Sequence, residues 1–210
     1  MTPASVTERV IQDLQRVRSW NLLWKVASAF GENSETGTRS RLSLRAIRKA
    51  ANADRDVDIG IASPGTEFEV RLHNRRFEPV WYSVFFLNGQ YGIEFVSSGT
   101  IRGRKALGED SASVVVDQMK LNSDTTGVEG YVAIGVPLDG NRAEPNFRFL
   151  AQPAIGEARS RSPVMIPERP TLFEQTLVEA ARAGNAVRSG VSSDDAEVTS
   201  ISWVTSGQKP

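Results

Sequence analysis

The chain of 210 residues contains no cysteine and a single histidine, His73. The absence of cysteine excludes disulfides, thiol nucleophiles, thiolate zinc sites and iron–sulfur clusters. One histidine cannot build a multi-histidine metal site, and it is the only candidate for any histidine-dependent mechanism. We therefore expect no metal and no cofactor.

The chain also lacks an excess of positive charge, since 25 Lys and Arg residues balance 25 Asp and Glu residues. A protein that binds a phosphate backbone normally has such an excess, so we expect no nucleic-acid partner. No apolar run reaches the ~18 residues of a transmembrane helix, and residues 1–18 lack the apolar core of a secretory signal. We therefore expect a cytoplasmic protein without a membrane partner.

Residues 1–30 have the pattern of an amphipathic helix that ends before Gly31. Apolar side chains recur at spacings of four and three at Val6, Val10, Leu14 and Val17. Two tryptophans near the end of this segment suggest a large packing partner. We predict that the apolar face covers a sheet; a docking face for another chain is the alternative.

Residues 40–151 show the patterns of β-strands separated by short turns. The segments with strand patterns are 41–47, 67–73, 80–87, 91–96, 114–119 and 131–136. Those over 80–87 and 131–136 are apolar on both faces, as in central strands covered on both sides. Asn88-Gly89 predicts a hairpin, and we expect loops after Ile47 and over 97–110. Strands without intervening helices favour an immunoglobulin-like antiparallel β-sandwich.

The C-terminal part is predicted to close this domain. Residues 152–170 contain four prolines and no periodicity, which is typical of a linker or a long loop. Thr171 and Glu174 form a capping-box pattern for a helix that ends at Gly184. The region 171–205 is thus a helix followed by a closing strand over 198–204. We expect one domain over residues 1–210.

Few titratable residues form a pattern that suggests catalysis. His73 falls on the wet face of the strand over 67–73, and no G-x-S-x-G elbow is present. Glu67 and Glu69 share that face about 7 Å apart, as in any amphipathic strand. The run Asp54–Asp58 is similar to a calcium loop but lacks the required glycine and glutamate. We predict that the chain is not an enzyme.

Basic residues supply a candidate binding site between two strands. No phosphate-binding glycine motif of the P-loop or dinucleotide type is present. The segment 100–105 nevertheless contains Gly103 and three cations, Arg102, Arg104 and Lys105. These three side chains are candidates for contact with a small anion or a partner, and a solvated β-connection is the alternative.

Five segments in a fixed order, spanning residues 10–205, support a family resemblance. They read VIQDLQRVRSWNLL (10–23), GTEFEVRLHN (65–74), VWYSVFFL (80–87), TGVEGYVAI (126–134) and FRFLAQ (147–152). Their order resembles the β-rich region that follows the catalytic domain in bacterial caspase-like peptidases. The chain departs from that pattern at Gly135, where the family's strand has an alanine.

The resemblance implies an accessory role without peptidase activity, because the His–Cys dyad of the catalytic domain is missing. It implies a protein-interaction or regulatory module of a bacterial defence or regulated-death system, with a caspase-like protease as partner. Two alternatives stay open. The chain is a protease substrate or inhibitor cut after Arg159, Arg161 or Arg169, or it is a small-anion sensor. The sequence leaves the oligomeric state undetermined.

Overall fold

The computed structural model describes residues 3–32, 41–48, 55–57, 65–105, 112–121, 127–138, 144–157, 177 and 196–205. These residues form one long α-helix, α1 (Pro3–Glu32), a short 3-10 helix, η3 (Arg148–Leu150), and eight strands. The strands are β1 (Leu42–Arg48), β2 (Arg55–Asp56), β3 (Glu67–Asn74), β4 (Val80–Leu87), β5 (Ile93–Ile101), β6 (Ala112–Lys120), β7 (Gly127–Pro137) and β8 (Glu197–Thr205).

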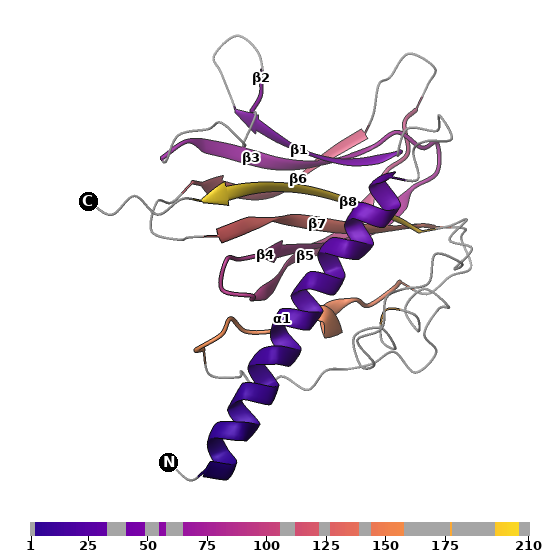
Figure 1. Cartoon of the computed structure of the whole chain (residues 1–210). Helices are drawn as coiled ribbons and strands as arrows, with labels where there is room; N and C mark the ends of the chain where they lie inside the picture. The colour runs from indigo at the N-terminus through magenta and orange to yellow at the C-terminus, as the bar shows by residue number, and fades with distance from the viewer. Residues whose placement is uncertain are drawn as a thin grey trace.

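The strands form two four-stranded sheets in which every paired neighbour runs antiparallel. Sheet A has the order β2-β1-β3-β6, and sheet B has the order β5-β4-β7-β8. α1 crosses sheet B on the face opposite sheet A (Figure 1). The prediction of a mainly β fold with two antiparallel, sandwich-like sheets and an N-terminal helix is confirmed.

Sheet B is apolar on both faces because it lies between sheet A and α1. On β7, Tyr131 and Ala133 belong to the core between the sheets, whereas Val132 and Ile134 belong to the core under α1. All four side chains are fully buried. This arrangement confirms that the segments over 80–87 and 131–136 are central strands covered on both sides.

α1 is attached to the rest of the molecule through its C-terminal half. Trp20 and Leu23 are buried in the core on sheet B, and the indole N–H of Trp20 donates to the carbonyl of Asn88 at 3.1 Å. Arg16 is buried and donates from Nη1 to the carbonyl of Ala154 at 3.0 Å. The prediction that this helix covers a sheet is confirmed for this half.

Two segments predicted as loops contain strands. β5 continues to Ile101, although residues 97–110 were expected to form a loop. Ser97 and Gly99 have low β-propensity, but they pair in register with Val84 and Tyr82 of β4, and pairing outweighs propensity. The short strand β2 likewise follows Ile47 and pairs with β1.

The predicted hairpin at Asn88-Gly89 is present, with a longer connection than a two-residue turn. β5 begins at Ile93, and the side-chain Oδ1 of Asn88 accepts hydrogen bonds from the N–H groups of Gln90 and Gly92 at 3.0 and 2.8 Å. Tyr91 adopts a φ of 63°, in the left-handed region. Asn88 therefore shapes the loop through its side chain rather than through a type I′ turn.

Part of the C-terminal prediction lies outside the described residues. The closing strand is confirmed as β8. Of the predicted helix from residue 171, only Leu177 is described, and it is buried against the core under α1. Residues 158–170 of the predicted linker lie outside the described part, as do Asp54 and Asp58.

A polar bridge joins the two sheets inside the sandwich. The hydroxyl of Tyr131 on β7 donates to Oδ2 of Asp117 on β6 at 2.6 Å. Burial, then the hydrogen bond to Asp117 and its charge, raise the pKa of Tyr131 far above the usual value of 10. Tyr131 is therefore held in its neutral form across the ordinary pH range.

This bridge predicts an alkaline loss of stability. Unfolded Tyr131 ionises near pH 10 while folded Tyr131 stays protonated, so the free energy of unfolding should fall above that pH by about 1.4 kcal/mol per pH unit. Tyr131→Phe should remove this contribution, and urea unfolding at a series of pH values measures it. Some slope remains in the variant because burial also raises the pKa of Tyr82. An unchanged slope in Tyr131→Phe contradicts the prediction.

β8 and β1 meet at a corner of the sandwich where they belong to different sheets and do not pair. One carboxylate closes this corner. Oε2 of Glu197 on β8 accepts a hydrogen bond from the backbone N–H of Leu42 at 2.6 Å. Its Oε1 forms an ion pair with the guanidinium of Arg76, whose Nε donates at 2.8 Å. Glu197 thereby connects the last strand of sheet B to the start of β1 in sheet A.

Candidate functional site

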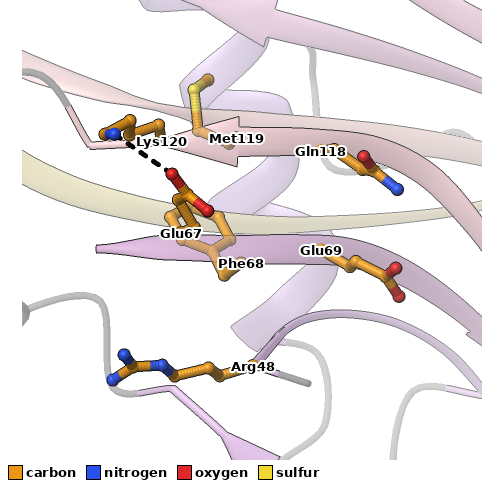
Figure 2. A pocket seen from close by; sticks show the side chains of 7 residues that line it. All are labelled: Arg48, Glu67, Phe68, Glu69, Gln118, Met119 and Lys120. Carbon is orange, nitrogen blue, oxygen red and sulfur yellow. Dashed lines mark ion pairs between the residues drawn. The ribbon is translucent and has the colours of Figure 1, made fainter. Parts of the chain in front are cut away.

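An open groove of about 550 Å³ lies at the end of sheet A where β1 and β6 end and β3 begins. Figure 2 shows the side chains that line it: Arg48, Glu67, Phe68, Glu69, Gln118, Met119 and Lys120. Phe68 belongs to the core between the sheets, and Met119 packs against that core. The groove therefore combines an apolar floor with both signs of charge.

Each carboxylate of the groove is close to a cation. Lys120 Nζ lies 3.1 Å from Glu67 Oε1, and both side chains are largely exposed, so this pair contributes little stability. Glu69 is buried, and its Oε2 accepts from Nε and Nη2 of Arg71 at 3.1 and 2.8 Å. In Figure 2 the side chain of Glu67 turns toward Lys120 and that of Glu69 points away from it. The two acids do not face each other as a catalytic pair.

His73 lies on the outer face of sheet A among cations. Burial lowers its pKa below the ordinary 6.5, and the charges of Arg45 and Arg71 lower it further, while Asp56 acts in the opposite direction. A lowered pKa keeps the imidazole neutral at pH 7 and makes it a weaker base.

Sequence reasoning missed the neighbours of His73. The register places Ser43 of β1 and Ser113 of β6 on either side of it. These serines come from strands far apart in the sequence, so only the strand pairing brings them to His73. The sequence contains no signal for that pairing.

The environment of His73 predicts a titration midpoint below 6.5. As the only histidine, it should give one imidazole Cε1–H signal, whose NMR shift against pH measures the midpoint. Arg45→Gln should raise the midpoint, and Arg148→Gln, which removes a cation over Phe95 instead, should leave it unchanged. Because the folded pKa is the lower one, stability should decline as pH falls below about 6.5. A midpoint at or above 6.5 contradicts this account.

The candidate anion site at Arg102, Arg104 and Lys105 packs against the turn that joins β3 to β4. The guanidinium carbon of Arg104 lies 4.0 Å from the ring centroid of Phe77, and its backbone N–H donates to the carbonyl of Arg76 at 2.9 Å. A Cβ at Gly103 would lie 1.8 Å from the carbonyl oxygen of Phe77, so this close approach requires glycine. Arg104 is thus used in packing, and anion binding stays a prediction.

The N-terminal half of α1 exposes apolar side chains. Val6, Val10, Ile11 and Leu14, here named the α1 stripe, are 48%, 52%, 51% and 63% exposed. The N-terminal end of α1 extends beyond the sheets (Figure 1). The prediction that these residues cover a sheet is wrong for Val6, Val10 and Leu14. The reason is that the face in contact with the sheet is formed by other residues further along the helix.

Two further classes of site find no support in the described part of the chain. Among its residues, no three His, Asp or Glu side chains lie together as metal ligands. The helix it contains is not apolar enough over 18 residues to cross a bilayer. The candidate cleavage positions Arg159, Arg161 and Arg169 lie outside the described residues.

No protein-family model and no curated protein matches this chain. Its function must therefore be inferred from the surfaces of the molecule itself. The two that stand out among the described residues are the groove at the end of sheet A and the α1 stripe.

Proposed function

We propose that the chain is a non-catalytic protein-interaction module, and the α1 stripe is the observation that carries this proposal. Single exposed apolar residues are ordinary, but four on one helical segment form a patch typical of a protein interface. The same helix has a second face, buried on sheet B. A helix with one face on its own domain and another in water is suited to join two chains.

The absence of a catalytic constellation among the described side chains supports the non-catalytic part. Glu67 and Glu69 each lie beside a cation, and burial, together with the arginines around it, lowers the pKa of His73. A general base works best with a pKa near the operating pH, and a carboxyl group that donates a proton needs a raised pKa. The chain has no cysteine that could act with His73.

The sheet edges are less suited than α1 to receive a partner strand. Of the four edge strands, β8 already lies against α1 and β1. β2 has two residues, and Gln152 forms a bridge with Ile93 at the start of β5. β6 carries devices that protect edges: a register shift, the inward-pointing Asp117 and the terminal Lys120. We therefore assign the interaction to α1 rather than to β-augmentation.

The strand order supports an immunoglobulin-like type of sandwich. In that fold, strands A, B and E are neighbours in one sheet, and strands C, F and G are neighbours in the other. β1, β3 and β6 have the first order, and β4, β7 and β8 have the second, with β5 added beside β4. The immunoglobulin-like type and the helix over 171–184 belong to this proposal.

A caspase-like protease is the partner class to test first. The resemblance of residues 10–205 to the accessory region of bacterial caspase-like peptidases is the only support for this partner. The same resemblance is the only support for a role in defence. The substrate reading, with cuts after Arg159, Arg161 or Arg169, and the anion reading at Arg102, Arg104 and Lys105 are alternatives.

Affinity purification of the tagged chain from its native host tests the proposal. The bait should be recovered intact together with a caspase-like protease, identified by mass spectrometry. Leu14→Asp, which puts a charge in the α1 stripe, should lose that protease, and Gln15→Asp on the neighbouring exposed residue should retain it. Recovery of bait cut after Arg159, Arg161 or Arg169 would favour the substrate reading. No protease with either bait would overturn the caspase-linked role.

A further inference from the structure

We propose that the α1 stripe is covered by α1 of a second copy of this chain, with the two helices parallel in a short coiled coil. The inference rests on the proposed function, because it names what covers the surface assigned there. A protease partner then binds the paired form of the chain, which Leu14→Asp abolishes. Eight of the ten residues from Val6 to Gln15 are exposed. Ten residues with several β-branched side chains make a marginal helix in water, and a second helix would stabilise them.

The exposed segment has the heptad pattern of a coiled coil. Positions a fall at Thr7, Leu14 and Asn21, and positions d fall at Val10 and Val17; these five positions form the seam. The seam ends before the next d position, Trp24, which packs against the chain's own core. The positions on the opposite side, b, c and f, are all polar in this segment: Glu8, Arg9, Gln12, Gln15, Arg16 and Ser19. The apolar seam and this polar face therefore lie on opposite sides of the helix.

The seam points away from the chain's own sandwich. At 100° per residue, Val10 and Leu14 lie roughly 130° around the helix axis from the face formed by Arg16, Trp20 and Leu23. Those three residues are buried against the sandwich. A second helix on the seam would displace none of these contacts. It would leave the two sandwiches on opposite sides of the helix pair.

The residues that flank the seam suit a parallel copy of the same helix. In a parallel pair, position g of one helix meets position e of the next heptad on its partner. That rule pairs Val6 with Ile11, both apolar, and Asp13 with Arg18, of opposite charge. An antiparallel pair that matches Val10 with Leu14 would instead bring Asp13 toward Asp13 of the other copy. Charge complementarity therefore favours the parallel arrangement.

Asn21 supports two helices in a fixed register. It is exposed at an a position, and its Nδ2 donates to the carbonyl of Val17 at 2.9 Å within its own helix. A single asparagine at an a position specifies register and the number of helices in coiled coils. Leu14 at a with valine at d is by itself a pattern closer to larger assemblies. The measured mass thus separates two copies from four.

Size-exclusion chromatography with light scattering tests the proposal on the full chain. We expect a mass of about 46 kDa, twice the 23.0 kDa of one chain, that falls toward the monomer on dilution. Leu14→Asp should give the monomer at every concentration, and Gln15→Asp should behave as the unaltered chain. A monomer throughout, a tetramer, or a dimer that survives Leu14→Asp would overturn the proposal.

The absence of cysteine allows a clean test of helix direction. Thr7→Cys introduces the only thiol, at an a position that meets its own counterpart in a parallel pair. Mild oxidation should therefore yield a disulfide-linked dimer of Thr7→Cys. In the antiparallel arrangement Thr7 would meet Val17 instead, so cross-linking would require a mixture of Thr7→Cys and Val17→Cys. A product in that mixture, with none from Thr7→Cys alone, would overturn the parallel form.

Failure of this inference is distinguishable from failure of the proposed function. Suppose that the purified chain is monomeric but Leu14→Asp still abolishes recovery of the protease. The α1 stripe then binds another protein, and the proposal of a second copy is wrong. If the chain is a dimer through the stripe but no protease is recovered, self-association stands and the caspase-linked role is wrong.

Discussion

Replacing Trp203 with alanine is expected to lower the free energy of unfolding by about 3 to 5 kcal/mol, the range for deletion of a buried aromatic side chain. Trp203 on β8 is 5% exposed, and its ring lies about 6 Å from three other rings. The centroid distances are 6.2 Å to Phe68, 6.2 Å to Phe86 and 6.0 Å to Tyr131. Because Phe68 is on sheet A and Trp203 on sheet B, the substitution removes a contact that joins the sheets.

Urea unfolding followed by circular dichroism measures this loss. The free energy of unfolding of a small domain is only about 5 to 15 kcal/mol, so Trp203→Ala can fail to fold. Trp203→Phe, which keeps one ring, should cost about 1 to 2 kcal/mol and remain measurable. The next residue, Val204, is 75% exposed, and Val204→Ala should change stability by less than about 0.5 kcal/mol. Equal losses at both positions would show that Trp203 does not hold the sheets together.

Gly130→Ala is the second substitution with a large expected effect. A Cβ at this position would lie 2.1 Å from the carbonyl oxygen of Ile201 and 2.9 Å from the ring of Trp24. The first contact is with backbone of the neighbouring strand β8, so β8 must move away from β7. We expect a loss at or beyond the upper end of the roughly 1–3 kcal/mol typical of overpacked sites.

A matched glycine elsewhere supplies the control for this prediction. Gly99 on β5 can take a Cβ at ordinary contact distance, with Tyr82 Oη the nearest atom at 3.4 Å. Gly99→Ala should leave stability unchanged or raise it by up to about 1 kcal/mol, because alanine has less backbone freedom in the unfolded chain. Thermal unfolding of both variants gives the comparison. Similar midpoints for the two would contradict the close approach of β7 and β8 at Gly130.

Much of the fold could be predicted because its signals are local. The polar–apolar alternation around Phe68 and Val70 marks β3. β4 and β7 are apolar on both faces, which indicates that both faces are covered. This signal lies in each strand's own residues. Periodicity therefore identified every described strand except β2, and it indicated the layered arrangement.

The remaining features depend on which segments meet. The second half of β5 has serine and glycine at Ser97 to Gly99, and only pairing with β4 makes it a strand. The pattern at Val10 and Leu14 predicts an apolar helix face, but the direction of that face depends on where α1 contacts sheet B. The groove at the end of sheet A gathers residues from β1, β3 and β6, so no single segment reveals it.

The corner closed by Glu197 has a consequence for synthesis on the ribosome. Glu197 bonds to Leu42, 155 positions earlier in the chain, so this contact forms only after translation has reached β8. Until β8 emerges, the edge of β7 that it pairs with is unpaired and Trp203 is missing from the core. Such long-range contacts slow folding and expose intermediates to aggregation. A nascent chain that stops before β8 should therefore depend on chaperones, and a release factor acting early should yield a fragment that proteases clear.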